Sequence, residues 1–407
     1  MNNTFPNSLI KVIMNIYIKS QILLYFVLII ISHSCNYKIE NDELSDYYTG
    51  PTIIGKVNNM GITIIDTIII TNINSSFLGF LQIEQNKIVY FDRIFGYVFY
   101  FDKNGEYIKR YLGKGRGPTD YPSSELFYHC STAENKHILM DLFWNYFVYD
   151  KEWNLISKKH IDFHEDRFSN SELINKPNPH MGPLYEIDFS IPTIIAINTT
   201  HILIPMLAQH IKPKWHSYSS LNHYKYFHVF GELDIKSGEM VRFFGRKSPE
   251  YLRYHYLPNF NKFYFDCTTN DIFITFEPDS LIFCISESGK HKYSFGFKGK
   301  DMLTDYPETK TFEESERTIA DHREKYSFYS SLKLIKKTDV LFRGYKKTSN
   351  KYDGLQAYKN TELLFDVNVP KTFKVIGYIS PFYYASTTTN DEDEKLIIYR
   401  FKINESE

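Results

Sequence analysis

The 407-residue sequence has few cysteines, no long hydrophobic run and almost no helical periodicity. Three cysteines follow Cys35, and this odd number argues against a disulfide framework. The longest apolar run, Ile22 to Ile31, has ten residues, whereas a membrane-spanning helix needs about 20. Basic and acidic residues are nearly balanced, at 47 and 48, so the sequence lacks the basic excess expected of a nucleic-acid-binding protein.

The sequence also lacks the usual signatures of catalytic and metal sites. It contains no G-x-S-x-G nucleophile motif and no H-E-x-x-H zinc motif. A histidine-rich stretch holds His216, His223 and His228, but spacings of 7 and 5 residues do not match paired metal ligands on one element. The glycines of 113–117 lack the G-x-G-x-x-G spacing of a dinucleotide loop, and Pro118 follows them. We therefore expect no metal, no cofactor and no identifiable catalytic residue.

The N-terminal segment indicates export. Lys11 and Lys19 are the only charged residues before Cys35, and the apolar run that follows them has the length of a signal-peptide core, about 7–15 residues. The pair Ser34-Cys35 resembles the end of the lipobox of bacterial lipoproteins. That resemblance implies cleavage before Cys35 and lipid attachment to its thiol. Because Ser32 stands where the pattern prefers Leu, an ordinary signal peptide is the alternative.

These features divide the chain into three parts. Residues 1–34 are the expected signal peptide, residues 35–50 a polar and acidic tether, and residues 51–407 a single β domain. The expected location is the bacterial cell envelope, as an outer-membrane lipoprotein that faces the periplasm or the cell surface. The lipid would be its only contact with the membrane, and we expect no nucleic-acid partner.

A repeat runs through the β domain. Asp92 and Asp102 each end a strand-like run, and so do Asp141 and Asp150. The step from Asp92 to Asp141 is 49 residues, and the step from Asp102 to Asp150 is 48. Two strands that end in Asp and recur at this interval indicate successive copies of one supersecondary unit.

A second repeat consists of a glycine, an alternating strand and a closing glycine. It occurs at Gly105–Gly113, Gly238–Gly245 and Gly289–Gly296. A unit of about 50 residues with three or four strands has the size of a propeller blade. We therefore predict an all-β fold, a six-bladed β-propeller with antiparallel four-stranded blades. Seven plain blades would also fit the length, whereas a β-sandwich predicts no fixed period.

Two local predictions accompany this fold. Glu313 to Tyr326 is the one stretch compatible with a helix, and we expect it to be an insertion between strands. Phe263–Cys267, Ile272–Phe276 and Leu281–Ile285 are predicted to be three consecutive antiparallel strands. The middle strand would then separate Cys267 from Cys284 by about 10 Å, too far for a disulfide.

Residues 85–125 resemble a known family. Phe101-Asp102-Lys103-Asn104-Gly105, followed by Gly113-Lys114-Gly115-Arg116-Gly117-Pro118, is similar to the blade signature of the six-bladed, TolB-like propeller lipoproteins of Gram-negative bacteria. The resemblance implies an envelope lipoprotein with a six-bladed propeller. It implies no established activity and supplies no catalytic residues.

The predicted function is non-enzymatic binding of a ligand or partner, with a glycan or acidic oligosaccharide as the first candidate. Basic residues follow each closing glycine, and equivalent turns would place them on one face of the disc; they are Lys114, Arg116, Arg246, Lys247, Lys298 and Lys300. Sugar rings could stack on Trp144, Trp153 or Trp215. A polysaccharide lyase or glycoside hydrolase on a propeller is one alternative, and a protein-interaction scaffold is another. Converging carboxylates with Tyr or His in a central pocket would favour the enzyme.

Overall fold

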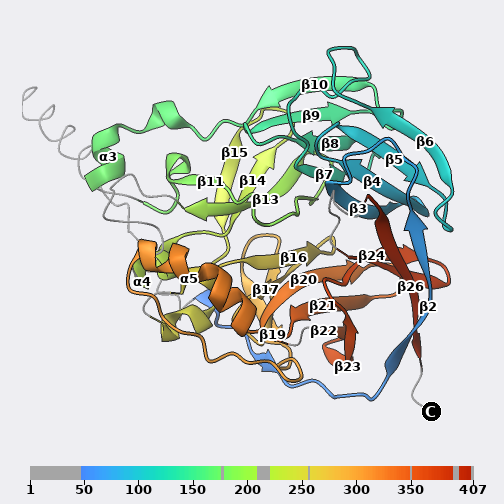
Figure 1. Cartoon of the computed structure of the whole chain (residues 1–407). Helices are drawn as coiled ribbons and strands as arrows, with labels where there is room; N and C mark the ends of the chain where they lie inside the picture. Colours follow the sequence, from blue (N-terminus) through green and yellow to red (C-terminus); the bar gives the residue numbers. More distant parts are fainter. Residues whose placement is uncertain are drawn as a thin grey trace, which may run out of the picture. The chain divides into compact units, whose positions relative to one another are not determined.

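The computed structural model describes residues 47–175, 178–208, 221–254, 257–348, 351–387 and 394–404. Within this part of the chain, six antiparallel sheets follow one another around a centre, which confirms the six-bladed β-propeller (Figure 1). The blades are numbered here in chain order. The predicted signal peptide and Cys35 lie outside the described residues. Among those that are described, no helix combines the length and apolarity required to cross a bilayer.

Blades 1 to 3 occupy the first half of the domain. Blade 1 consists of β3 (Gly79–Glu84), β4 (Lys87–Asp92), β5 (Tyr97–Phe101) and β6 (Tyr107–Leu112). Blade 2 consists of β7 (Tyr128–Ser131), β8 (His137–Met140), β9 (Asn145–Tyr149) and β10 (Leu155–His160). Blade 3 consists of β11 (Tyr185–Ile187), β12 (Ile195–Ala196), β13 (His201–Ala208), β14 (Phe230–Asp234) and β15 (Met240–Phe244). Both short strands of blade 3, β11 and β12, pair with β13.

Blades 4 to 6 complete the ring, and blades 4 and 6 each include a strand from the start of the domain. Blade 4 consists of β16 (Phe263–Cys267), β17 (Asp271–Phe276), β18 (Ile282–Ser286), β19 (His291–Phe295) and β1 (Thr52–Ile53). Blade 5 consists of β20 (Phe328–Ile335), β21 (Val340–Lys346), β22 (Tyr352–Lys359) and β23 (Glu362–Pro370). Blade 6 consists of β24 (Lys374–Ile379), β25 (Phe382–Ser386), β26 (Leu396–Asn404) and β2 (Gly61–Ile70).

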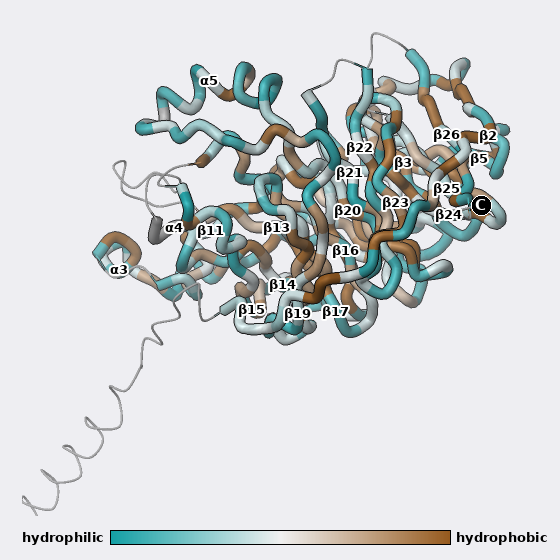
Figure 2. Tube along the Cα trace, turned by 90° about the horizontal axis from the view of Figure 1, so that it is seen from below, coloured by the Kyte–Doolittle hydropathy of each residue, from teal (hydrophilic) through white to brown (hydrophobic). Residues whose placement is uncertain are grey.

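The remaining elements are short helices and one longer helix. They are η1 (Glu165–Arg167), α3 (Asn170–Asn175), η2 (Gly182–Leu184), α4 (Leu221–Tyr226), η3 (Pro249–Arg253), η4 (Pro258–Phe260) and α5 (Phe312–Lys325). Helix α5 lies between β19 and β20, which confirms the predicted helical insertion. The hydroxyl of Thr311 caps it by accepting the Glu314 N–H. Most of α5 is hydrophilic in Figure 2, whereas the strands beside it include many hydrophobic residues.

Burial follows the position of each strand within its blade. The middle strands β4 and β5 are buried along nearly their whole length, because a neighbouring blade covers each face. The outermost strand β6 is mostly exposed. Apolar side chains of blades 1 and 2 form one shared cluster, and those of blades 6 and 1 form another. The core of the domain is therefore a set of layers between blades.

The repeated aspartates hold equivalent turns. The buried Asp92 carboxylate accepts the N–H groups of Ile94 and Phe95 after β4. Asp141 accepts the N–H groups of Phe143 and Asn145 after β8, and it is also buried. A short side chain that accepts hydrogen bonds from the following backbone fixes such a turn. The 49-residue step therefore marks the same position in blades 1 and 2.

The glycine repeat marks the outermost strands. The pairs of glycines flank β6, β15 and β19, and the glycines themselves have φ between +75° and +134°. This conformation is open to glycine at little cost. In blade 4, the order β16-β17-β18 is the one predicted from sequence. The middle strand separates the two cysteines, and Cys130, Cys267 and Cys284 are all free thiols.

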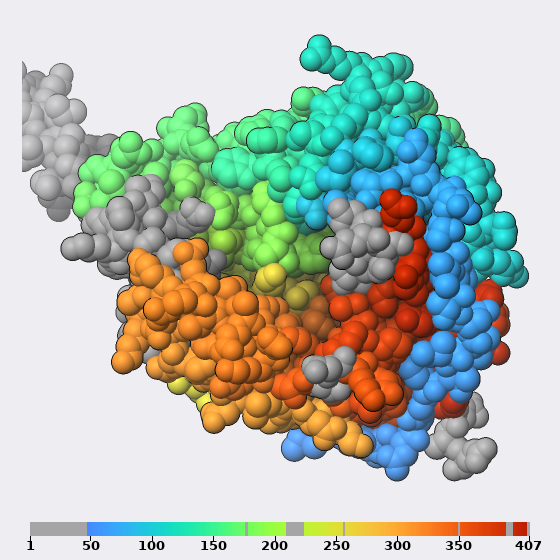
Figure 3. All heavy atoms as spheres, viewed as in Figure 1, coloured from blue at the N-terminus to red at the C-terminus, as the bar shows by residue number. Residues whose placement is uncertain are grey.

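The segment from Tyr47 to Ile70, which we term the strap, runs along three blades. The Tyr47 hydroxyl donates to the Gly289 carbonyl at 2.5 Å, and β1 then pairs in parallel with β19 of blade 4. Next, Asn58 N–H donates to the Leu363 carbonyl of blade 5. Finally, β2 pairs with β26 and becomes the outermost strand of blade 6 (Figures 1 and 3). The packed chain therefore begins ahead of residue 51, where the sequence placed the domain boundary.

Candidate functional site in the central channel

The innermost strands of the six blades surround a cavity of about 490 Å³. Every blade contributes a segment to its wall; the segments include Gln82–Gln85, His129–Ser131, Ile194–Ala196, Asp266, Lys333–Lys337 and Ile376–Tyr378. A second cavity of about 390 Å³ lies where these strands begin, and it shares Gln82, His129, Asp266 and Lys333 with the first. The two cavities are therefore two parts of one central channel. Their volumes suit a small ligand.

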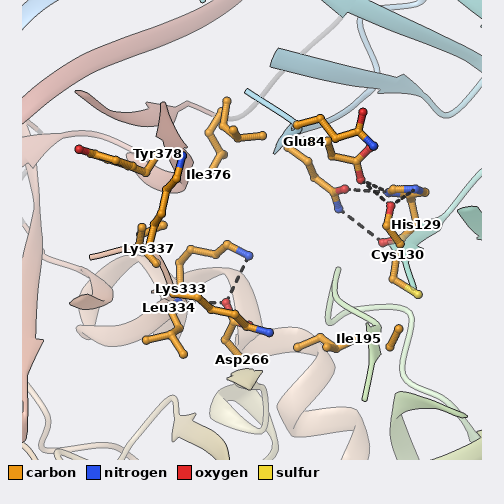
Figure 4. Close-up of a pocket in the computed structure, with 18 of the residues that line it drawn as sticks. Glu84, His129, Cys130, Ile195, Asp266, Lys333, Leu334, Lys337, Ile376 and Tyr378 are labelled. Atoms are coloured by element: carbon orange, nitrogen blue, oxygen red, sulfur yellow. Dashed lines mark hydrogen bonds and ion pairs between the residues drawn. The ribbon is translucent and has the colours of Figure 1, made fainter. Parts of the chain in front are cut away.

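One wall of the channel carries a cluster of two histidines and a carboxylate. Glu84 ends β3, His129 lies on β7 and His137 begins β8. His129 Nε2 and His137 Nδ1 are 3.1 Å apart, and His129 Nδ1 lies 3.4 Å from Glu84 Oε1. The Ser131 hydroxyl donates to Glu84 Oε1 at 2.9 Å. Figure 4 shows Glu84 and His129 on the same side of the pocket.

Burial controls the protonation of this cluster. It raises the pKa of the Glu84 carboxyl to about 7, because the charged form loses water. It holds the pKa of His129 well below its ordinary value and lowers that of His137 to about 4. Both imidazoles are therefore neutral at pH 7, and each has one nitrogen lone pair available.

Aromatic side chains fix the orientation of the two imidazole rings. Trp153 stacks on His137 with centroids 3.9 Å apart and an interplanar angle of 8°. Phe91 stacks on His129 at 4.2 Å. Trp153 has a positive φ of 67°, an unusual conformation for a bulky residue, and its turn is held by the Asp150 carboxylate that accepts two backbone N–H groups. The repeat aspartate of the sequence thus positions a side chain behind the histidines.

The opposite wall of the channel is basic. Lys333, Lys336 and Lys337 come from β20 and the turn after it, and Lys336 and Lys337 are exposed. Lys333 Nζ lies 3.2 Å from Asp266 Oδ2, which also accepts the Leu334 N–H. In Figure 4, Lys333 and Lys337 lie across the pocket from Glu84 and His129, with Tyr378 beyond them. A ligand in the channel would therefore meet cations on one side and polar acceptors on the other.

The predicted basic turns are only partly exposed. Each follows the outermost strand of its blade and leads toward the next innermost strand, the connectivity from which we predict that all three lie on the same side of the ring. Lys114, Arg116, Lys298 and Lys300 are exposed. Arg246 and Lys247 are buried, and the prediction that they add to an exposed binding face is wrong.

Lys247 instead belongs to the packing of blades 3 and 4. Its ammonium donates to the Asn261 carbonyl and lies over the rings of Tyr251 and Phe263, at 5.5 and 5.3 Å from their centroids. Burial lowers the pKa of Lys247 to about 8. A basic residue in a turn is therefore not always exposed, because the connection that follows it can fold back over it.

The three tryptophans do not form an exposed platform. Trp153 is buried behind His137, so the prediction that it stacks on a sugar is wrong. Trp144 is half-buried and packs against Phe163 in the core of blades 2 and 3. Trp215 lies outside the described residues. Of the histidines considered from sequence, His228 is buried, and His216 lies outside the described residues.

Sequence analysis missed Glu84, His129 and His137. His129 and His137 face each other across the β7–β8 hairpin, where Ser131 pairs with His137. Their spacing of eight residues matches no metal motif, because the hairpin and not a helical turn brings them together. The available signal was the blade repeat, since it identifies which strands are innermost and therefore line the channel.

Comparison with known proteins supports the fold. No protein-family profile and no curated protein sequence matches the chain. A solved structure of a DUF4221 family member from Bacteroides vulgatus is similar, with a TM-score of 0.63 and 14% identity; the match covers 86% of this chain and 100% of that one. A Bacteroides fragilis protein described as exported has a TM-score of 0.52 and 13% identity, with 87% and 100% covered. At these identities the likeness establishes the propeller fold alone.

Proposed function

We propose that the protein binds an acidic oligosaccharide, one that contains a uronic acid, in the central channel. The observation that carries this proposal is the composition of the channel wall. Lysines of blade 5 face the Glu84, His129 and Ser131 side chains of blades 1 and 2 across a cavity of about 490 Å³. In a concave site, a small number of polar groups at defined positions is enough to orient a small ligand and to make its binding specific.

The chemistry of each wall matches a different part of such a sugar. Ammonium groups of Lys336 and Lys337 can pair with the sugar carboxylate in charge-assisted hydrogen bonds. Gln82, Gln85 and Ser131 can exchange hydrogen bonds with hydroxyl groups. The half-buried ring of Tyr378 offers an apolar surface to the face of a sugar ring.

We propose the cell envelope as the site of this activity. The short apolar core and Ser34-Cys35 support export with a lipid anchor. The likeness in fold to a Bacteroides protein described as exported supports the same location. An outer-membrane lipoprotein would hold the propeller where acidic polysaccharides from outside the cell arrive.

The test is calorimetric titration with oligomers of a hexuronic acid, with neutral hexose oligomers as the ligand control. We expect the double substitution Lys336→Gln, Lys337→Gln to weaken binding about tenfold, which corresponds to about 1.4 kcal/mol. We also expect affinity to fall as salt concentration rises, because exposed charges are screened. The matched control removes the exposed charges of the basic turns; its substitutions are Lys114→Gln, Arg116→Gln, Lys298→Gln and Lys300→Gln.

The two sets of variants separate the channel from the basic turns. If the control set weakens binding and the channel set does not, the ligand binds the outer face and the channel proposal is wrong. If neither acidic nor neutral oligomers bind, the sugar-binding proposal itself is wrong.

A second candidate function is cleavage of the same sugar. Glu84, His129 and His137 converge in a channel whose other wall carries lysines, and acid–base cleavage next to a carboxylate needs both features. The check is incubation of hexuronate oligomers with the protein, followed by chromatography of the products. Cleavage that Glu84→Gln abolishes would favour the enzyme, whereas intact oligomers in the presence of measurable binding would exclude it.

A further inference from the structure

We propose that Glu84, His129 and His137 form a binding site for a divalent transition-metal ion, with Zn²⁺ as the ion that suits this donor set best. Two imidazole nitrogens and one carboxylate are a common set of protein ligands for catalytic zinc. This inference goes beyond oligosaccharide binding and does not rest on it.

The distances between the donor atoms fit a metal ion. One donor atom from each of the three residues can be chosen so that all lie within 4.8 Å of one another. His129 Nε2 and His137 Nδ1 are 3.1 Å apart, and His137 Nδ1 is 4.0 Å from Glu84 Oε2. Zinc–ligand bonds of about 2.0–2.1 Å in a tetrahedron place neighbouring donors about 3.3 Å apart. Small side-chain rotations would therefore complete the geometry.

A hydrogen bond outside the cluster already fixes the tautomer that metal binding requires. The Gln82 side-chain nitrogen lies 3.4 Å from the His129 carbonyl, so its Oε1 faces His129 Nδ1 at 2.8 Å. An amide oxygen only accepts, and His129 Nδ1 must therefore carry the proton. His129 Nε2 is left with its lone pair, which accepts the hydrogen bond of His137 Nδ1 in the structure. A bound metal ion would take the place of that proton. Metal-binding histidines usually donate their second N–H to such a partner.

The charge of the cluster is also unbalanced. The Glu84 side chain is only 15% exposed, and within the described residues no lysine or arginine forms an ion pair with it. A buried carboxylate without a cation is costly. A divalent ion would balance this charge, and the imidazole nitrogens and the carboxylate can bind such an ion directly.

The fourth coordination position would face the channel. The exposed Ser131 hydroxyl lies 2.9 Å from Glu84 Oε1, 3.3 Å from His137 Nδ1 and 3.5 Å from His129 Nε2. The Ser131 hydroxyl therefore marks the fourth vertex, and a water molecule or a ligand from the channel would have to take its place there. Three protein ligands with a fourth position open to water or substrate distinguish reactive zinc sites from closed structural ones. A ligand in the channel would have direct access to this position.

The experiment measures metal binding by the purified protein after treatment with EDTA. We expect calorimetry and elemental analysis to show one Zn²⁺ per chain, and Co²⁺ to give the intense visible bands of tetrahedral coordination. Glu84→Gln keeps the size of the side chain and its acceptance of the Ser131 hydroxyl, yet it should reduce affinity by more than 100-fold. Gln82→Leu should reduce it by about 10–100-fold, as loss of an orienting partner does.

His160→Gln is the matched control, because His160 is exposed on β10 and distant in sequence from the cluster. It should leave the stoichiometry and the Co²⁺ spectrum unchanged. Zn²⁺ should also raise the melting temperature of the wild type but not that of Glu84→Gln. The proposal is overturned if the wild type binds no stoichiometric Zn²⁺ or Co²⁺, or if Glu84→Gln binds both as the wild type does. Either result would make the cluster a self-contained hydrogen-bond network and would leave oligosaccharide binding untouched.

Discussion

Arg343 provides the sharpest test of how the blades are held together. This residue lies on β21 of blade 5 and is completely buried. Its Nη1 donates to the Ser280 carbonyl at 2.8 Å, and its Nη2 donates to the Phe297 carbonyl at 2.7 Å; both acceptors follow strands of blade 4. The same guanidinium donates to Gln356 Oε1 and to the Tyr358 hydroxyl within its own blade.

The substitution Arg343→Met removes these donors while keeping a long, unbranched side chain. The Tyr358 hydroxyl already donates to Gln356 Oε1 at 2.9 Å, so these two groups can satisfy each other. The Phe297 carbonyl keeps the Gln356 amide and the Tyr329 hydroxyl as donors. The Ser280 carbonyl loses the Arg343 donor, and a buried acceptor without a partner costs about 1–3 kcal/mol. We therefore expect Arg343→Met to lower the free energy of unfolding by about 1–3 kcal/mol. Removing the buried charge also removes its desolvation cost, which acts in the opposite direction. We expect this gain to be smaller than the loss, because the carbonyl acceptors remain buried in the variant.

Urea denaturation followed by tryptophan fluorescence measures this loss. Arg253→Met is the control, since the Arg253 side chain is 73% exposed and its ion pair with Glu250 joins neighbouring residues of one helical turn. The control should change stability by less than about 0.5 kcal/mol. If Arg343→Met is no more destabilising than Arg253→Met, or if it stabilises the protein, the guanidinium does not join the two blades.

Three further predictions concern titration, packing and location. Burial raises the pKa of the Asp279 carboxyl to about 6. The folded protein therefore binds the carboxyl proton more tightly than the unfolded chain does, and the free energy of unfolding should fall as pH rises from about 4 to 6. Asp279→Asn should abolish that fall and stabilise the protein by about 3 kcal/mol at pH 7. Thermal melts across this pH range measure the effect, and a pH profile like that of the wild type would contradict the prediction. Gly354→Ala should lower the free energy of unfolding by about 1–3 kcal/mol in urea melts, because its methyl group would lie 1.9 Å from the buried Tyr345 ring. Gly61→Ala is the control; its methyl group would meet no atom within 4 Å, and stability should not change. Cys35→Ala should release the protein from the membrane fraction, and retention at the wild-type level would exclude the lipid anchor.

The fold was largely predictable because its signals are local and repeated. Asp92 and Asp141 recur at a fixed step since each accepts hydrogen bonds from the turn that follows its own strand. The glycines that flank β6, β15 and β19 have positive φ, a requirement of the backbone that the sequence shows directly. Helix α5 carries its own capping residue. None of these signals depends on which blade lies opposite.

The candidate site was not predictable by the same means, because contacts between blades create it. Glu84 belongs to blade 1 and His129 to blade 2, and no local pattern shows that β3 and β7 line the same channel. The prediction that all the basic turns are exposed failed for a related reason. Lys114 and Lys247 follow equivalent glycines, but Lys247 is covered by Tyr251 from the connection to blade 4 and by Phe263 at the start of β16. Whether a turn residue is exposed depends on how the following connection folds, since the longer connection after Gly296 leaves Lys298 and Lys300 exposed.

The way in which the ring closes has a consequence for the time course of folding. The pairs Ile64–Phe401 and Ile70–Leu396 join the first long strand of the domain, β2, to its last strand, β26. Until β26 is available, β2 has no partner, and blade 6 and the contact between blades 6 and 1 stay incomplete. Contacts between residues so far apart in sequence slow folding, because a long loop must close before they form. Blades 1 to 5 can begin to fold as they are synthesised, but the ring itself closes only after β26 is present.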